Sequence, residues 1–578
     1  MSEQNLSSLI WSVADLLRGD YKQSDYGKVI MPFTVLRRLD CILEPTKAQV
    51  LVEYQKRTKE GVDPTPFLNR ISKQSFYNHS PLDMNKVLAD PSHIKSSLLN
   101  YINGFSSNVN DIFERYEFDK QIEKLDEAGL LFMVTKKFAE VDLHPNVVSN
   151  AGMGTLFEEL IRKFAELSNE TAGEHFTPRE VIRLMVDLLL HADSEALSKP
   201  GVIRTIYDPT AGTGGMLSIA EEYLTGSNGL NPDATLIVHG QELNPESYAI
   251  CKGDMLIKGQ DISNIKFGDT LKNDGHPDAK FDYGIANPPF GVKWEKAKKE
   301  VVQEHERMGF AGRFGPGLPP IDDGSFLFLL HLISKMREPK KGGGRIAMVL
   351  NGSPLFSGDA GSGESEIRKW IIEQDLLEAI IALPVDMFYN TNIGTYIWIL
   401  SNHKSKERAG KIQLINAVDC YQKMRKSLGK KRKELSDSDI ARIGKLYFDF
   451  KETKESKIFD GADFGYRKIT IQKPLFDEDG NPVLSTKGKT KGKPLPDKSF
   501  RDFERVPLKD NIDDYFKREV LPHLPNVSID ESKSKIGYEI PFSRHFYEYK
   551  PPRSLSEIDA DLKRVTSEIQ ALLDEVSE

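Results

Sequence analysis

Cysteine is scarce in this sequence: Cys41, Cys251 and Cys420 are the only three among 578 residues. No pair of them has the CxxC spacing that is typical of zinc and redox sites. We therefore expect a protein of a reducing compartment without a bound metal ion. The sequence also has no apolar run long enough to span a bilayer, and no basic and apolar leader at its start. These absences predict a cytoplasmic protein that does not bind membranes.

Positive charge is in deficit overall, because 78 Lys and Arg face 86 Asp and Glu, giving a net charge of −8. The whole surface is therefore not a nucleic-acid footprint, since phosphate binding needs a local excess of cations. Two basic runs remain, "KMRKSLGKKRK" at 423–433 and "KGKTKGK" at 487–493. Either run can be a solvated surface, and this alternative is stronger for the second. We recognise no P-loop and no nuclease carboxylate cluster.

The chain is too long for one hydrophobic core, and its patterns indicate four parts. Residues 1–165 have the 3.6-residue apolar period of a helical domain, interrupted by proline-containing breaks. In residues 166–405 short apolar runs alternate with amphipathic helices, which predicts a doubly wound, Rossmann-like α/β domain with a largely parallel sheet. Residues 406–545 form a mixed, partly irregular extension. Residues 546–578 end in a long helix.

The final helix carries a strict heptad seam. Its apolar positions are spaced alternately three and four residues apart: Leu555, Ile558, Leu562, Val565, Ile569, Leu572 and Val576. Such a seam is narrower than the apolar stripe of an ordinary surface helix, so it favours docking into a helical bundle. Packing against the chain's own core is the alternative.

A glycine-rich turn, "DPTAGTGGML" at 208–217, follows a predicted strand and opens a predicted helix. Gly212, Gly214 and Gly215 permit a tight turn and a close approach of a ligand to the backbone, while the helix N-terminus offers free N–H groups. The spacing is neither GxGxxG nor that of a P-loop. A nucleoside ligand therefore fits better than a dinucleotide or ATP.

Two acidic residues follow at the ends of the next strands. Glu242 ends the second predicted strand and Asp269 the third. In a doubly wound sheet, ligands bind outside the carboxyl ends of the strands. Glu242 can therefore accept hydrogen bonds from both hydroxyls of a ribose, and Asp269 can accept one from an adenine amino group. Each acid taken alone is more often a solvated strand end.

The fourth predicted strand ends in a rigid corner, Asn287-Pro288-Pro289-Phe290. Two consecutive prolines fix two φ angles and remove two backbone donors. The Asn287 amide oxygen and the Pro288 carbonyl are then two adjacent acceptors for the hydrogens of an amino group. The Phe290 ring can stack on a base. This corner is suited to holding an amino group.

These motifs and their order resemble the adenosylmethionine-dependent amino methyltransferases of DNA, which carry [N/D/S]PP[F/Y/W] after a glycine-rich motif. "GEHFTPREVIRLMVDLL" (173–189), "DPTAGTGG", "NPPFG" and "LLRGDYKQSDYGKVIMPFTVLRRLD" (16–40) look more closely like the modification subunit of type I restriction-modification systems. The resemblance covers nearly the whole chain and is weakest at 405–545.

The resemblance implies an enzyme that transfers a methyl group from S-adenosyl-L-methionine to the N6 amino group of adenine in double-stranded DNA. It implies that residues 166–405 are the methyltransferase domain and that a separate specificity subunit recognises the DNA site. A third, restriction (motor-nuclease) subunit would cleave DNA. The C-terminal helix would dock on the specificity subunit. Positioning and desolvation would then replace a general base.

The resemblance also implies site residues. Those implied to bind the cofactor are Glu174, His175, Phe176, Thr177, Pro178, Arg179, Asp208, Gly212, Thr213, Gly214, Gly215, Glu242 and Asp269. Those implied to hold the target adenine are Asn287, Pro288, Pro289 and Phe290. From its residues alone, "FTP" would be a helix start, with Thr177 as the cap and Pro178 in the first turn.

Two alternatives stay open at this point. The same fold and motif occur in methyltransferases that act on RNA bases or on a protein glutamine amide, although those are usually shorter chains. A non-catalytic assembly subunit with a vestigial fold is the second. Methylation of duplex DNA, assayed with and without a partner, distinguishes the first, and cofactor binding distinguishes the second.

Overall fold

The computed structural model describes residues 12–577 except 151, 155–156, 158–159, 161–176, 227–228, 390, 429, 480, 487–491, 493, 501 and 550–553. The chain divides into two compact units, Met1–Ile540 and Pro541–Glu578. No helix among the described residues has the length and apolarity needed to cross a membrane.

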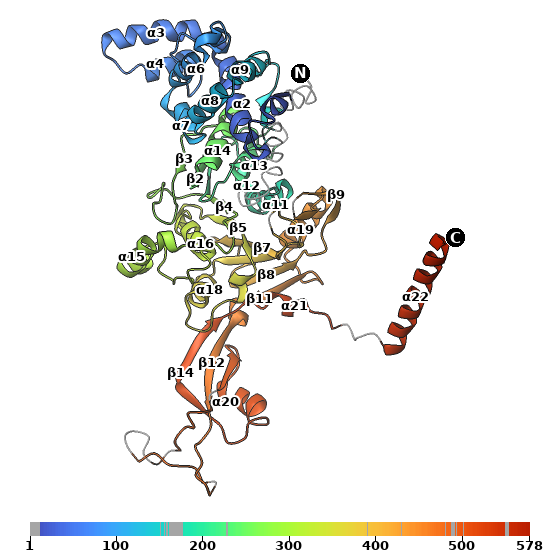
Figure 1. Ribbon diagram of the computed structural model, residues 1–578. Coiled ribbons are helices and arrows are strands. Elements are labelled where there is room, and N and C mark those ends of the chain that lie inside the picture. The colour runs from blue at the N-terminus through green and yellow to red at the C-terminus, as the bar shows by residue number, and fades with distance from the viewer. Residues whose placement is uncertain are drawn as a thin grey trace. The chain divides into compact units, whose positions relative to one another are not determined.

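The N-terminal part of the first unit is helical, as predicted (Figure 1). Its helices are α2 (Tyr26–Leu43), α3 (Lys47–Glu60), α4 (Thr65–Ser72), α5 (Met84–Val87), α6 (Ile94–Asn103), α7 (Ser107–Arg115), α8 (Phe118–Glu127) and α9 (Leu131–Ala139). Helix α2 lies at the centre and is buried over almost its whole length. The Arg38 guanidinium near its middle is fully buried and donates to the Val148 carbonyl and to Asn150 Oδ1.

Nine of the described strands form one sheet in the order β11-β8-β6-β7-β5-β4-β1-β2-β3. They are β1 (Ile203–Asp208), β2 (Thr235–Glu242), β3 (Ile265–Phe267), β4 (Tyr283–Ala286), β5 (Arg345–Asn351), β6 (Leu377–Ala382), β7 (Thr395–Ser401), β8 (Lys411–Asn416) and β11 (Ser456–Asp460). Only β7 and β11 run antiparallel to their neighbours. The predicted fold class, a helical domain followed by a largely parallel α/β domain and a long C-terminal helix, is confirmed.

Helices cover both faces of the sheet. The connecting helices are α11 (Arg179–Leu190), α12 (Ser194–Leu197), α13 (Gly215–Thr225), α14 (Pro245–Ile257), α15 (Lys298–Met308), α16 (Ser325–Ser334), α17 (Ser353–Phe356), α18 (Gly363–Glu373) and α19 (Asp437–Asp449). In β5, Ala347 and Val349 join the core that includes α11, α13 and α14. On the opposite face α16 packs on β5, and its Phe326 ring contacts Trp398 of β7 edge to face. Alternate side chains of the strands thus fill two cores.

The helical domain packs directly on α14. Every residue from Ser247 to Ile257 is buried, because α2 and α7 cover the side of α14 that the sheet leaves open. Asp111 of α7 accepts from Lys252 Nζ at 2.9 Å and from Tyr248 Oη at 2.7 Å. One continuous apolar core therefore runs from the N-terminal helices into the sheet.

Beyond residue 405 the sheet continues, since β8 and β11 pair into it. The division of the chain into four parts, with one boundary at residue 405, stays a prediction. A hairpin of β9 (Gln422–Leu428) and β10 (Lys431–Glu434) follows β8, and β12 (Gly465–Gln472), β13 (Asp502–Pro507) and β14 (Ser528–Tyr538) form a second sheet. Helix α20 (Ile512–Tyr515) packs on this sheet, with Ile512 and Tyr515 against a small core that includes Ile469 and Val506. The basic run at 487–493 lies almost entirely outside the described residues.

The second unit contains α21 (Phe542–His545) and α22 (Leu555–Ser577). The predicted long C-terminal helix is therefore present. Within this unit the side chains of Leu562 and Ile569, at the centre of the seam, are 60% and 53% exposed.

Candidate active site

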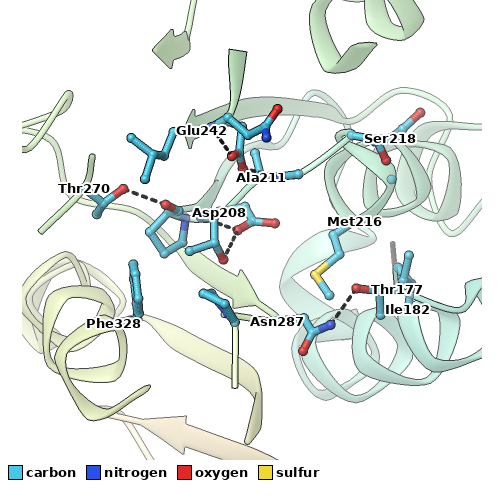
Figure 2. Close-up of a pocket in the computed structure, with 18 of the residues that line it drawn as sticks. Thr177, Ile182, Asp208, Ala211, Met216, Ser218, Glu242, Thr270, Asn287 and Phe328 are labelled. Carbon is cyan, nitrogen blue, oxygen red and sulfur yellow. Dashed lines mark hydrogen bonds between the residues drawn. The ribbon is translucent and has the colours of Figure 1, made fainter. Parts of the chain in front are cut away.

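A cavity of about 540 Å³ lies outside the carboxyl ends of β1 to β4. From β1 the chain continues to β2 and β3 on one side and then crosses to β4 on the other. Ligands of doubly wound folds bind at such a reversal of strand order. Nine of the predicted site residues line the cavity: Thr177, Asp208, Gly212, Thr213, Gly215, Glu242, Asp269, Asn287 and Pro289. Figure 2 shows several of these side chains around it.

The glycine-rich loop after β1 needs its glycines for two reasons. Gly212 and Gly214 have φ angles of +54° and +81°, which favour glycine. A Cβ atom on Gly214 would also lie 2.6 Å from the sulfur of Cys251. The backbone of the loop therefore forms one wall of the cavity, with α13 beginning at Gly215.

Glu242 fixes this loop from the end of β2. Its side chain is buried, and its two carboxylate oxygens accept from Gly212 N at 2.8 Å and Asn244 N at 2.7 Å. A carboxylate offers about four lone-pair positions, so each oxygen can still accept another hydrogen bond. Asp269 lies two residues beyond the end of β3, half-buried, and accepts from Leu271 N at 3.0 Å.

Asp208, at the end of β1, is 1% exposed. Burial, with a smaller contribution from the nearby Glu242 charge, raises the pKa of its carboxyl to about 7, although hydrogen bonds from Thr210 act in the opposite direction. Thr210 N donates to Asp208 Oδ1 at 2.9 Å. This raised pKa favours the neutral form of the Asp208 carboxyl, so the cavity carries less negative charge than its acidic lining residues suggest.

Asn287 follows β4 directly, at the predicted rigid corner. Its Nδ2 donates to Thr177 Oγ1 at 2.9 Å, a contact drawn in Figure 2. Its Oδ1 is buried, and no described group donates to it. A buried amide oxygen without a partner costs about 1–3 kcal/mol. The fold therefore orients an unsatisfied acceptor at the cavity wall.

Thr177 does not cap α11, contrary to the expectation from "FTP". The helix begins at Arg179 with Pro178 in the cap position, and the cap makes no side-chain hydrogen bond. The Thr177 hydroxyl instead accepts from Asn287, because the corner after β4 lies beside it.

The other predicted residues lie around the cavity without lining it. Pro178 is buried, and exposed Arg179 donates to Glu222 of α13. The half-buried Phe290 ring contacts Phe388 edge to face, with 6.3 Å between centroids. Gly214 and Pro288 are also absent from the lining. Glu174, His175 and Phe176 lie outside the described residues.

The sequence patterns did not single out several of the lining residues, among them Leu243, Lys258 and Phe328. Leu243 lines the cavity although 59% of it is exposed, and its position directly after Glu242 was the available signal. Lys258 of the α14 C-terminus donates to Asp254 at 2.6 Å and to Ser218 at 2.9 Å. Phe328 comes from α16, more than 35 residues beyond the last predicted motif. Nothing local in the sequence marks Lys258 or Phe328.

Arg313 connects the loops beneath the cavity. Its guanidinium donates to the carbonyls of Thr270 and Leu271 at 2.7 and 3.1 Å, while Glu304 pairs with its other side. The Thr270 hydroxyl in turn donates to the Pro209 carbonyl at 2.6 Å. This network fixes the loop after β3 against the loop after β1.

Two models of known families match this chain. The family model "N-6 DNA Methylase" matches residues 148–463, and "HsdM N-terminal domain" matches residues 6–138. Because the first match covers more than half of the chain, the chain belongs to the N-6 DNA methylase family, whose members use S-adenosylmethionine. Within that family it is the methylase subunit of a type I restriction-modification system, an adenine-N6 DNA methyltransferase.

Relatives share this assignment. The type I restriction enzyme MjaIX methylase subunit of Methanocaldococcus jannaschii is 26% identical over 447 residues, 75% of each chain. The HindI methylase subunit of Haemophilus influenzae is 31% identical over 46% of this chain and 54% of its own. Among solved structures, a type I restriction-modification system methyltransferase subunit from Streptococcus thermophilus has a TM-score of 0.63 and 24% identity, covering 80% of this chain and 97% of that one.

Proposed function

We propose that the cavity binds S-adenosylmethionine beside an adenine flipped out of duplex DNA, and that Asn287 and Pro288 hold the adenine amino group. The observation that carries this proposal is the buried Asn287 Oδ1, an acceptor that no described group satisfies. An amino hydrogen would satisfy it. A chain that had lost its activity would have no reason to keep so costly an acceptor.

The cofactor fits the other wall of the cavity. The glycine-rich loop permits close approach to the backbone, and Glu242 has free lone pairs for ribose hydroxyls. Leu243 offers an exposed apolar surface next to it, suited to the face of a purine. Asp269 is half-buried and can accept from an adenine amino group. When bound, S-adenosylmethionine supplies an electrophilic methyl group.

The residues of this chain act on the target nitrogen. Drawing both amino hydrogens toward Asn287 Oδ1 and the Pro288 carbonyl localises the lone pair on that nitrogen, which makes it a better nucleophile. The prolines keep the two acceptors in place, and Thr177 fixes the amide orientation. Alignment of this kind supplies about 7–11 kcal/mol of catalysis. The proton can leave to water afterwards, so no general base is assigned.

The partners follow from membership of a type I system. We propose that this chain works with a specificity subunit that recognises the DNA site and with a restriction subunit that cleaves DNA. The exposed seam of α22 is the surface that supports the first of these contacts.

Replacing Glu242 by Ala tests the cofactor site. The variant loses a charged acceptor and the anchor of Gly212, so we expect adenosylmethionine binding to weaken by about 10- to 100-fold, corresponding to about 1.5–3 kcal/mol. Calorimetry of the purified chain measures this, and saturating cofactor should partly restore methyl transfer. Exposed Glu246, which does not line the cavity, provides the matched control Glu246→Ala. An unchanged dissociation constant in Glu242→Ala would place the cofactor elsewhere.

Phe290 tests the stacking role. Phe290→Ala removes a ring worth about 1–3 kcal/mol of base stacking, so we expect methyl transfer to duplex DNA to fall by about 5- to 150-fold. Phe290→Tyr keeps the ring and should keep the activity. Phe290→Leu keeps most of the volume without the ring, and activity retained in this variant would show that Phe290 only packs against Phe388.

A further inference from the structure

The β9–β10 hairpin concentrates cations in an acidic chain. Residues 423–433 contain seven Lys and Arg, although the net charge of the chain is −8. Five of these are exposed: Lys423, Arg425, Lys426, Lys430 and Arg432. None of the five forms an ion pair with a carboxylate in the described part of the chain. We call these five the hairpin cations.

The strand register brings like charges together. Lys423 lies directly opposite Lys433 across the two strands. Like charges at such positions destabilise a pair of strands. The Lys433 ammonium lies over the Tyr421 ring, 4.0 Å from its centroid. A polyanion bound to the hairpin would offset the repulsion between the two lysines.

One lysine of the run is not a surface residue. Lys431 is 2% exposed, and its ammonium contacts the Glu180 carboxylate and donates to the Lys433 carbonyl at 2.6 Å. Glu180 lies in the first turn of α11, three residues after Thr177. This buried ion pair therefore fixes the hairpin beside the wall of the active site that orients Asn287.

The hairpin is also attached to the loop after β6. Lys430 N donates to the Tyr389 carbonyl at 2.9 Å, and Arg432 N donates to the Asp386 carbonyl at 2.9 Å. Between these two acceptors lies Phe388, whose ring contacts Phe290. The hairpin cations are thus held on the segment that adjoins the proposed stacking residue.

A flipped base brings its backbone with it. The nucleotide rotates about its own sugar-phosphate chain, so the phosphates on either side remain at the mouth of the pocket. Lysine and arginine bind phosphate through charge-assisted hydrogen bonds. A rim of unpaired cations next to the pocket meets this requirement.

We propose that the hairpin cations bind the DNA backbone phosphates that flank the flipped adenine. This inference rests on the proposed function, because it presumes that the target base enters beside Asn287 and Phe290. Phosphate contacts carry no sequence information. The hairpin therefore supplies affinity and positioning, and the DNA site is recognised elsewhere.

The test compares two charge-matched variants of the chain assembled with its specificity subunit. The hairpin variant carries Ala at Lys423, Arg425, Lys426 and Lys430. The control carries Ala at Lys56, Lys59, Arg70 and Lys73, which are exposed in the helical domain. Each variant loses three lysines and one arginine. Binding to a duplex with the recognition site and to a scrambled duplex is measured between 50 and 200 mM salt.

We expect the hairpin variant to bind both duplexes more weakly, with the slope of log affinity against log salt less steep by about 0.9 for each lost phosphate contact. The control should match the unmodified chain. A variant with Arg in place of Lys423, Lys426 and Lys430 keeps the charge and should keep the slope, which separates charge from hairpin folding. An unchanged slope in the Ala variant overturns the proposal, as does loss of the specificity subunit from that variant. The readout is DNA binding, so failure of the cofactor assignment would appear separately, in the Glu242 experiment.

Discussion

Replacing Asn287 by Ala should lower methyl transfer to duplex DNA by about 10²–10³-fold, the usual effect of removing one preorganised hydrogen-bond partner from an active site. The amide oxygen is buried and unsatisfied, so its loss relieves the folded chain of an unpaired acceptor and should not destabilise it. Adenosylmethionine affinity should stay close to that of the unmodified chain, because Asn287 donates to Thr177 and not to the glycine-rich loop. Single-turnover transfer and calorimetry measure the two quantities.

Two companion variants make the assignment specific. Asn287→Asp retains an acceptor in the same position and should retain part of the activity. Thr177→Val keeps the shape of Thr177 but removes the oxygen that orients the amide, so we expect a loss smaller than that of Asn287→Ala. Near-normal transfer in Asn287→Ala, with cofactor binding intact, would remove Asn287 from the mechanism.

Replacing Leu562 and Ile569 by Asp should abolish co-purification with the specificity subunit and, with it, site-specific methylation. The seam leaves large apolar side chains exposed on a helix of 23 residues. An isolated helix of this length is only marginally stable in water, so a packing partner is expected. Two charges at the centre of the seam would be desolvated without a counter-charge in any such bundle.

Ala560 and Ser567 provide the control for this experiment. They have the same seven-residue spacing and occupy the face of α22 opposite the seam, so Ala560→Asp with Ser567→Asp adds the same charge to the same helix. This control should assemble normally. The Leu562 and Ile569 variant should still fold and bind cofactor on its own. Assembly retained in that variant would exclude the docking role, and an unfolded chain would favour packing of the seam on the chain's own core.

The sequence predicted the sheet well because its strands are short and apolar between clear turn signals. Seven short apolar runs in the sequence, at 202–208, 234–243, 264–269, 281–289, 343–356, 376–388 and 394–404, correspond to β1–β7. The motif after each of the first four strands lies at one edge of the sheet. The position of these motifs at one edge of the sheet follows from the parallel direction of the strands alone. Strands β8 and β11 were not anticipated, since pairing at a sheet edge leaves little trace in local composition.

The sequence did not predict contacts between residues that lie far apart along the chain. Thr177 and Asn287 are 110 residues apart, and "FTP" has a sufficient local explanation as a helix start, so nothing marked Thr177 as the partner of the amide. Lys431 lies within a basic run whose composition indicates uniform exposure, yet its partner Glu180 is 251 residues away. Such pairs depend on how the elements pack, which periodicity does not encode.

The burial of α14 has a consequence for how this protein can be divided or recombined. Its residues from Ser247 to Ile257 are covered jointly by the sheet and by α2 and α7, and Lys252 has its counter-charge on Asp111 of the helical domain. A fragment lacking the N-terminal helices would expose this apolar surface and leave Lys252 without its carboxylate. The methyltransferase sheet is therefore no minimal catalytic fragment. Chimeras between related methylase subunits would have to exchange α2, α7 and α14 as one unit, even though residues 116–244 separate the last two in the sequence.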